Sequence, residues 1–112
     1  MKRVLLDENL PRGLRRDLPD FAVRTVQEEN WTSLANGDLL GRAQDRFDVL
    51  LTADRRLQFQ QNLSRFKMGI VVVLTVSLQY RHIRVAVDAI RGALAAVEPG
   101  QLLHVQVPSP HR

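Results

Sequence analysis

Apolar runs and helix-like repeats alternate along the chain of 112 residues. Five runs rich in Val, Ile, Leu or Phe have the length and composition of β-strands. They lie at residues 3–6, 21–26, 48–52, 70–74 and 102–107. Between these runs, apolar residues three or four positions apart predict helices over residues 10–18, 37–47, 54–63 and 83–97.

The last of these helices has the clearest pattern. Its apolar residues form one stripe, with spacings of four, three, four and three residues: Ile83, Val87, Ile90, Leu94 and Val97. Pro99 and Gly100 then supply a stop signal. The first helix is shorter, because its three leucines span only about two turns behind Pro11.

This alternation predicts an α/β domain in three layers (α/β/α), with a mainly parallel five-stranded sheet between the helices. Parallel neighbours require a crossover of a dozen or more residues, and the helical stretches provide it. We expect residues 1–107 to form one domain and residues 108–112, which include two prolines, to form a disordered tail. In such sheets, ligands bind beyond the carboxyl ends of the strands.

The composition argues against several classes of protein. Apolar residues make up 45% of the chain, which argues against intrinsic disorder. The longest apolar run, residues 68–76, is about half a membrane span, and Asp7 interrupts the N-terminal run too early for a signal peptide. Without cysteine there is neither a disulfide framework nor a thiolate metal site. These features predict a cytoplasmic protein with no membrane association.

Positive charge is concentrated in the second half of the chain. The formal net charge is +4, and residues 1–56 carry ten cationic and ten acidic side chains, so the excess arises from residues 57–112. Fourteen of the sixteen cations are arginine, which suits contacts with phosphate or carboxylate. A basic chain favours a polyanion or an acidic protein as partner. Arg81 and Arg84 are candidates for binding substrate phosphate, with plain surface charge as the alternative.

Two aspartates follow the ends of predicted strands. Asp7 comes directly after the run 3–6, and Asp54 comes two residues after the run 48–52. If these strands are neighbours, about 4.8 Å apart, both carboxylates lie within reach of one ion. Asp38 stands at a helix start, where it interacts well with the helix dipole and could equally be only a cap. Oxygen ligands without cysteine or a usable histidine suit Mg²⁺ or Mn²⁺, which can activate water against a phosphodiester.

Three further polar residues are close to these acids in the sequence. Thr52 is two positions before Asp54, so both side chains face the same side of an extended chain. Its hydroxyl could therefore orient a water molecule or a phosphate oxygen. Asn9 could cap the following helix or contact phosphate. Glu8 points away from Asp7 along a strand, and we treat it as a secondary candidate.

Three segments occur in an order that resembles a known family. Residues 5–11, Leu-Leu-Asp-Glu-Asn-Leu-Pro, are followed by Asn-Gly-Asp at 36–38 and by Val-Leu-Leu-Thr-Ala-Asp at 49–54. Together they resemble the short PIN-like nucleases, and more narrowly the small toxin-type proteins of bacterial toxin–antitoxin pairs. The resemblance covers nearly the whole chain and implies a three-layer PIN-like domain.

The resemblance implies a ribonuclease that requires Mg²⁺ or Mn²⁺ and hydrolyses RNA. Carried onto this chain, the metal-binding and catalytic acids are Asp7, Asp38 and Asp54. Thr52 is then a further catalytic residue, and Asn9 supports the site. The resemblance also implies a small cognate antitoxin protein that blocks the site, and assembly as a homodimer.

Two departures from the family pattern leave a non-catalytic alternative open. Arg56 and Leu57 stand where members of this branch often carry a second aspartate and a phenylalanine. No residue clearly supplies a fourth acid, because Asp88 lies on an unsuitable face of the last helix. A catalytically degenerate PIN-like module that binds RNA or protein is therefore one alternative.

A receiver-like phosphoacceptor domain is the other alternative. Such domains carry an acidic pair after the first strand, an aspartate after the third and a threonine after the fourth. Residues 7–8, Asp54 and Thr75 fit this outline. A receiver also needs a lysine after its last central strand, however, and the only lysines of this chain are Lys2 and Lys67.

Overall fold

The computed structural model describes residues 1–57 and 62–109. The strands are β1 (Lys2–Leu6), β2 (Phe21–Thr25), β3 (Val49–Thr52), β4 (Gly69–Leu74) and β5 (Leu102–Gln106). The α-helices are α1 (Asn36–Ala43), α3 (Tyr80–Ile83) and α4 (Val87–Ala96). Three 3-10 turns accompany them, η1 (Arg12–Asp17), η2 (Leu63–Arg65) and η3 (Arg84–Ala86).

All five strands pair in parallel, in the order β2-β1-β3-β4-β5. The prediction of a mainly parallel five-stranded sheet is therefore confirmed. This is the flavodoxin-like order of a doubly wound sheet. β1 and β3 are neighbours, with Val4 opposite Val49 and Leu6 opposite Leu51. The chain runs from β1 to β2 on one side of β1 and then crosses to β3 on the other side, so the strand order reverses between β1 and β3.

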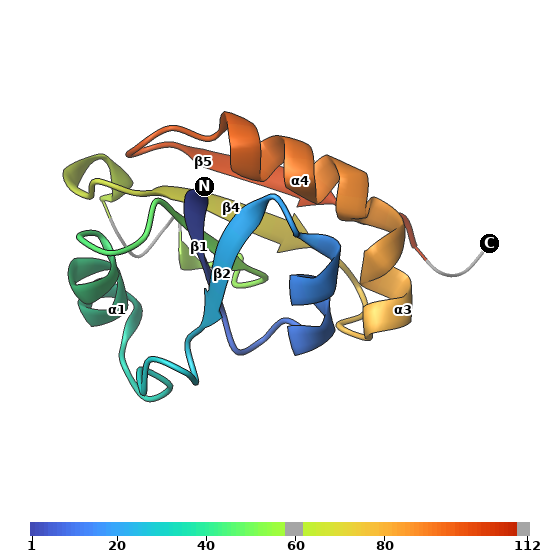
Figure 1. Cartoon of the computed structure of the whole chain (residues 1–112), viewed down its shortest axis with the longest axis horizontal. Coiled ribbons are helices and arrows are strands. Elements are labelled where there is room, and N and C mark those ends of the chain that lie inside the picture. The colour runs from blue at the N-terminus through green and yellow to red at the C-terminus, as the bar shows by residue number, and fades with distance from the viewer. Residues whose placement is uncertain (58–61, 110–112) are drawn as a thin grey trace.

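The two faces of the sheet bury different residues, because side chains alternate along each strand. On one face, alternate strand residues pack under η1, α3 and α4, among them Val4, Leu6, Val49, Leu51, Val71 and Val73. On the other face, the intervening strand residues pack under α1, among them Leu5, Leu50, Ile70 and Val72. Figure 1 shows α4 lying along the sheet and α1 on the opposite side. The three-layer α/β/α architecture is thus confirmed.

The helix predicted over residues 10–18 is present, but it is shorter than predicted and of the 3-10 type. This stretch forms the 3-10 turn η1, over Arg12–Asp17. Prolines at positions 11 and 19 bracket the stretch, and each restricts the backbone around it, so only a short helix fits between them. The apolar spacing was still informative, because all three leucines of the stretch are buried.

The last predicted helix is present but divided. It begins at Tyr80, three residues earlier than expected, and the 3-10 turn η3 separates α3 from α4. In a 3-10 turn, residues three apart share one face, and Ile83 and Ala86 are both buried. None of the helices in the two described ranges combines the length and the apolar character that a membrane crossing requires.

Two further predictions fall partly outside the described residues. The predicted helix over residues 54–63 includes residues 58–61, and the predicted tail over residues 108–112 includes residues 110–112. The described part of the tail, Pro108 and Ser109, belongs to no helix or strand.

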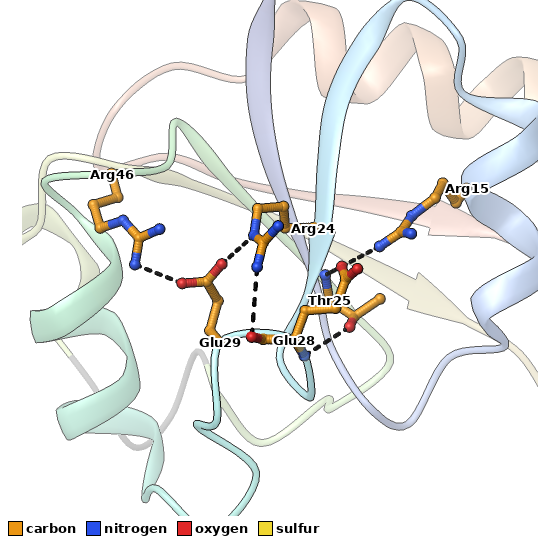
Figure 2. A network of polar contacts seen from close by, with 6 residues as sticks. All are labelled: Arg15, Arg24, Thr25, Glu28, Glu29 and Arg46. Atoms are coloured by element: carbon orange, nitrogen blue, oxygen red, sulfur yellow. Dashed lines mark hydrogen bonds and ion pairs between the residues drawn. The ribbon is translucent and has the colours of Figure 1, made fainter.

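The segment that connects β2 to α1 is fixed by polar contacts (Figure 2). The Thr25 backbone N–H donates to Glu28 Oε1 (2.9 Å), and the Glu28 backbone N–H donates to Thr25 Oγ1 (3.1 Å). This reciprocal pairing has the form of a capping box. Arg15 of η1 adds an ion pair to Glu28. The chain therefore leaves β2 through a defined turn.

Glu29 is the centre of the same network. Its side chain is only 4% exposed, and its carboxylate pairs with Arg24 and Arg46. The hydrogen bond from Arg24 is the main reason why the pKa of Glu29 lies below its ordinary value; burial opposes the shift, and Arg46 adds to it. The Arg46 guanidinium carbon also lies 5.7 Å from the ring centroids of Trp31 and Phe47.

We expect Glu29→Gln to lower the free energy of unfolding at pH 7 by about 1–2 kcal/mol, a figure reduced because both guanidinium groups are half exposed. Since the pKa of Glu29 is lowered in the folded state, its contribution is present above the unfolded pKa of about 4.3. The contribution is lost as pH falls through the lower, folded value. The difference between wild type and variant should therefore shrink in acid.

Urea unfolding at pH 7 and at a series of pH values below about 4.3 measures this difference. Glu98→Gln is the matched control, because Glu98 is exposed and has no ionic partner in the part of the chain that the structure describes. A loss in Glu29→Gln that stays constant as pH falls would contradict an ionic role for Glu29.

Candidate functional site

The carboxyl ends of β1 and β3 lie side by side at the point where the strand order reverses. Asp7 follows β1 directly, and its backbone N–H donates to the carbonyl of Leu51 in β3 (2.9 Å). Thr52 is the last residue of β3 and is opposite Val72 of β4. In doubly wound sheets the carboxyl ends of the strands at such a reversal are the usual place for a ligand. The condition set for a shared ion, that these two strands are neighbours, is therefore met.

The Thr52 hydroxyl connects the polar residues at this edge of the sheet. It donates to Asp7 Oδ2 (2.7 Å), and it accepts from Asn9 Nδ2 (3.3 Å) and from the Asp54 backbone N–H (3.1 Å). Thr52 is completely buried and Asp7 is only 9% exposed. Because the hydroxyl has one hydrogen and gives it to Asp7, it fixes the orientation of that carboxylate.

Asn9 holds the two loops of the site together. Its Oδ1 accepts from the backbone N–H of Ala53 (3.2 Å), while its Nδ2 donates to Thr52. Both ends of the amide are thus engaged with the β3 exit. In this arrangement Asn9 is a positioning residue for Thr52, which is a different role from the phosphate contact considered for it.

Asp54 connects the β3 exit to the beginning of α1. Its Oδ2 accepts from Asn36 Nδ2 (3.2 Å), and its Oδ1 accepts from the backbone N–H and the Nε of Arg56 (2.9 and 3.3 Å). Partial burial opposes ionisation, but the hydrogen bonds from Arg56 and Asn36 outweigh it and hold the pKa of Asp54 below its ordinary value. Asp54 is therefore a charged carboxylate at neutral pH, 15% exposed and already paired.

The remaining predicted site residues are not part of this hydrogen-bonded cluster. Asp38 is exposed in the first turn of α1, two residues after Asn36. Glu8 is exposed, and only its backbone N–H joins the site, by donating to Asp7 Oδ1 (2.9 Å). Arg81 and Arg84 lie beyond the end of β4, in α3 and η3. Across residues 1–57 and 62–109, no three acidic or histidine side chains are grouped as a metal site would require.

Two residues of the cluster were not predicted as site residues. Asn36 was noted only as part of the Asn-Gly-Asp segment, and Arg56 only as a departure from the family pattern. A local signal exists for Arg56: an aspartate that accepts from the backbone N–H two residues later forms a common turn at loop starts. For Asn36 the contact joins residues 18 positions apart, so it required the fold.

The carboxylate oxygens of the cluster are suitable ligands for a hard cation. Asp7 presents two carboxylate oxygens, and each accepts a single hydrogen bond, so lone pairs remain on both. Mg²⁺ keeps several waters and needs only one or two protein carboxylates beside substrate phosphates. Asp7 is thus the residue best placed to hold such an ion, with Asp54 as the second carboxylate.

The comparisons with known proteins found no match. Neither a protein-family model, nor a curated protein, nor a solved structure is similar to this chain. The interpretation of the site therefore depends on its geometry and on the sequence segments that form it.

Proposed function

We propose that this protein is a metal-dependent ribonuclease that hydrolyses RNA phosphodiester bonds, and that it is the toxin of a toxin–antitoxin pair. The observation that carries the proposal is the Asp7–Thr52–Asp54 cluster at the reversal point of the sheet. The resemblance of residues 5–11, 36–38 and 49–54 to small PIN-like toxins supports the same function. The excess of arginine suits an RNA substrate.

Asp7 and Asp54 would hold Mg²⁺ or Mn²⁺ in this proposal. The resemblance adds Asp38 as a third acid, although the described residues do not group it with the other two. When bound, the ion would activate water and neutralise charge that develops on the phosphodiester. Thr52 keeps the Asp7 carboxylate in one orientation, and Asn9 keeps Thr52 in place. Because Asp7 is 9% exposed, its charge is less screened than that of a surface carboxylate.

The proposal is tested by incubating the purified protein with single-stranded and structured RNA. We expect cleavage with Mg²⁺ or Mn²⁺, no cleavage with excess EDTA, and recovery when either ion is added back. A single-stranded DNA of the same sequence serves as the control for substrate class. Cleavage that EDTA leaves unchanged would contradict the metal mechanism.

The toxin role adds two expectations, a small antitoxin that blocks the cluster and a homodimer. Expression of the chain alone in bacteria should arrest growth, and co-expression with a neighbouring small reading frame should restore it. Normal growth at high expression of an RNA-cleaving protein would contradict the toxin role while leaving the ribonuclease proposal intact.

A binding module without catalysis is the second candidate function. The observation that favours it is the ion pair between Asp54 and Arg56, since a carboxylate that is already paired with arginine attracts a metal cation less strongly. Such a module would retain RNA in a filter-binding assay with EDTA and would not shorten it when Mg²⁺ or Mn²⁺ is supplied.

A receiver-like phosphoacceptor has weaker support. Receiver domains have the strand order that is observed here, and Thr75 follows β4. Both lysines, however, lie at the amino edge of the sheet: Lys2 begins β1, and Lys67 precedes β4. Neither can hold a phosphoryl group on Asp54 at the carboxyl edge. Incubation with acetyl phosphate and mass spectrometry should therefore detect no phosphorylated protein.

A further inference from the structure

Exposed apolar side chains are concentrated around the beginning of α3. Four large apolar side chains are exposed among the residues that the structure describes, and one is the N-terminal Met1. The other three are Val76 (75% exposed), Leu78 (49%) and Val85 (67%), all within ten positions of one another. Scattered exposed apolar residues need no explanation, but a group of this kind is typical of an interaction surface.

The loop that carries Val76 and Leu78 contacts the helix that precedes Val85. The Ser77 hydroxyl, between Val76 and Leu78, lies 2.7 Å from Nδ1 of His82 in α3, and it accepts from the Gln79 backbone N–H (3.2 Å). His82 and Val85 in turn line a hollow of about 400 Å³ with Arg81, Pro108 and Ser109. The loop after β4, the first turn of α3 and the exit from β5 therefore form one surface, which we call the α3 patch.

The α3 patch has a positive rim. Within the described residues, the Arg81 guanidinium donates to a neutral acceptor, Gln79 Oε1 (3.0 Å). Arg84 has no ion pair within the described ranges of the chain. Asp88, one turn further on, lines a different hollow with Lys2 and Arg91. No acid of the described structure therefore neutralises Arg81 or Arg84.

The first residue of α3 contacts η1. The Tyr80 hydroxyl donates to Asp17 Oδ2 (2.6 Å), so this acid is already hydrogen-bonded. That hydrogen bond raises the pKa of Tyr80, while the positive charges of Arg16 and Arg84 act on the same hydroxyl in the opposite direction. Arg16 of η1 and Arg84 of η3 are thus both close enough to Tyr80 to act on its hydroxyl.

The chemistry of the patch favours a protein partner over the other occupants. Single-stranded RNA binds to aromatic platforms, whereas the exposed side chains here are Val and Leu, which do not stack on bases. A second copy of the chain on this face would bring Arg81 and Arg84 together with their own copies, and like charges repel. Apolar side chains within an arginine rim instead match a segment that carries leucines and carboxylates.

We propose that Val76, Leu78 and Val85, with Arg81 and Arg84, form a docking surface for an acidic amphipathic helix of a partner protein. Leucines on one face of that helix would cover the valines and Leu78, and glutamates along its edges would pair with the arginines. The inference is independent of RNA cleavage. Because the patch follows the carboxyl end of β4, two strands from β1, a partner bound there would lie on the same edge of the sheet as Asp7.

The test uses a synthetic helical peptide of about 16 residues, with leucines at positions i, i+3, i+4 and i+7 and glutamates on the flanks. In a titration of ¹⁵N-labelled full-length protein, we expect amide shifts over residues 76–85 and at Ser109. A peptide with lysine in place of every glutamate should bind at least about tenfold more weakly. A peptide with serine in place of every leucine should not bind.

Variants then locate the contact. Val85→Glu should weaken peptide binding at least about tenfold, and it should fold normally because the side chain is already exposed. Ala22→Glu, on the exposed side of edge strand β2, is the matched control and should bind like the wild type. Circular dichroism of both variants checks the fold.

Several results would overturn the proposal. Peptide shifts confined to other residues, equal binding of the lysine and glutamate peptides, or unchanged binding in Val85→Glu would each do so. An RNA oligonucleotide that displaces the peptide from residues 76–85 would assign the patch to nucleic acid instead. A dimer of the free protein in sedimentation that Val85→Glu dissociates would assign it to a second copy of this chain.

Discussion

An Asp7→Asn protein is expected to keep its fold and to lose RNA cleavage by at least about 100-fold. Asparagine has the shape of aspartate, so its oxygen can still accept the Thr52 hydroxyl at the position of Oδ2, at the loss of the hydrogen bond that Oδ1 accepts from the Glu8 backbone N–H. It has no negative charge, however, and it is a weaker ligand for a hard cation. The loss should therefore appear in the rate of cleavage, measured on a labelled RNA with saturating Mg²⁺ or Mn²⁺.

Asp88→Asn is the matched control for this variant. Asp88 is also an aspartate, but it is exposed on α4 and lines a hollow with Lys2, at the amino end of β1. Its substitution should leave cleavage unchanged, and this also tests whether it acts as the missing fourth acid. Full activity in Asp7→Asn would remove Asp7 from the mechanism. Full activity in Asp38→Asn would remove only the third acid from the proposed set.

The largest effect on stability is expected from Gly69→Ala, which should lower the free energy of unfolding by about 2–3 kcal/mol. Gly69 begins β4 beside the turn that follows α4, and a Cβ there would lie 2.8 Å from the Glu98 carbonyl oxygen and 2.8 Å from Val97 Cγ2. The Glu98 carbonyl cannot easily move away, because it accepts from the Gln101 backbone N–H (3.0 Å). Thermal unfolding should shift downward by roughly 10 °C.

Gly92→Ala should change stability in the opposite direction. Gly92 is exposed within α4, and a Cβ at this position would meet no atom within 4 Å. Alanine there reduces the freedom of the unfolded chain, so we expect a gain of about 0.5–1 kcal/mol. Urea unfolding of both variants provides the comparison. Equal effects of the same sign would contradict the close approach described for Gly69.

The strands could be predicted from the sequence because a parallel sheet covered on both faces makes each strand an almost continuous apolar run. The run 48–52 contains four buried residues that form β3, and the three valines at 71–73 lie in β4. Helix type was harder to predict. The three leucines in and around η1 have the spacing of an α-helix, and only the restraint from Pro11 and Pro19 distinguishes the shorter 3-10 helix.

The site could be predicted only in part. Asp7 and Thr52 meet through their side chains and Asp54 joins them through its backbone N–H, because residues at the carboxyl ends of adjacent parallel strands share one edge. That both carboxylates reach one ion stays a prediction. The contact between Asn36 and Asp54 depends on where α1 begins relative to the β3 exit, and no local pattern encodes that placement. Asp38 is an exposed residue of a helix start, for which a sequence alone cannot distinguish a ligand from a solvated charge.

The all-parallel pairing also determines when the site can be assembled. None of the four strand pairs in the described structure is joined by a hairpin. Lys2 pairs with Phe21, Val49 with Gly69, Ile70 with Leu102, and Val4 with Val49. Among these pairs, the β1–β3 pair that carries the acids joins the residues farthest apart in the sequence, since Val4 and Val49 are 45 positions apart. Such non-local pairing slows folding, since loop closure must precede the stabilising contacts. On a ribosome, a nascent chain would therefore not form the Asp7–Thr52–Asp54 cluster until β3 had emerged.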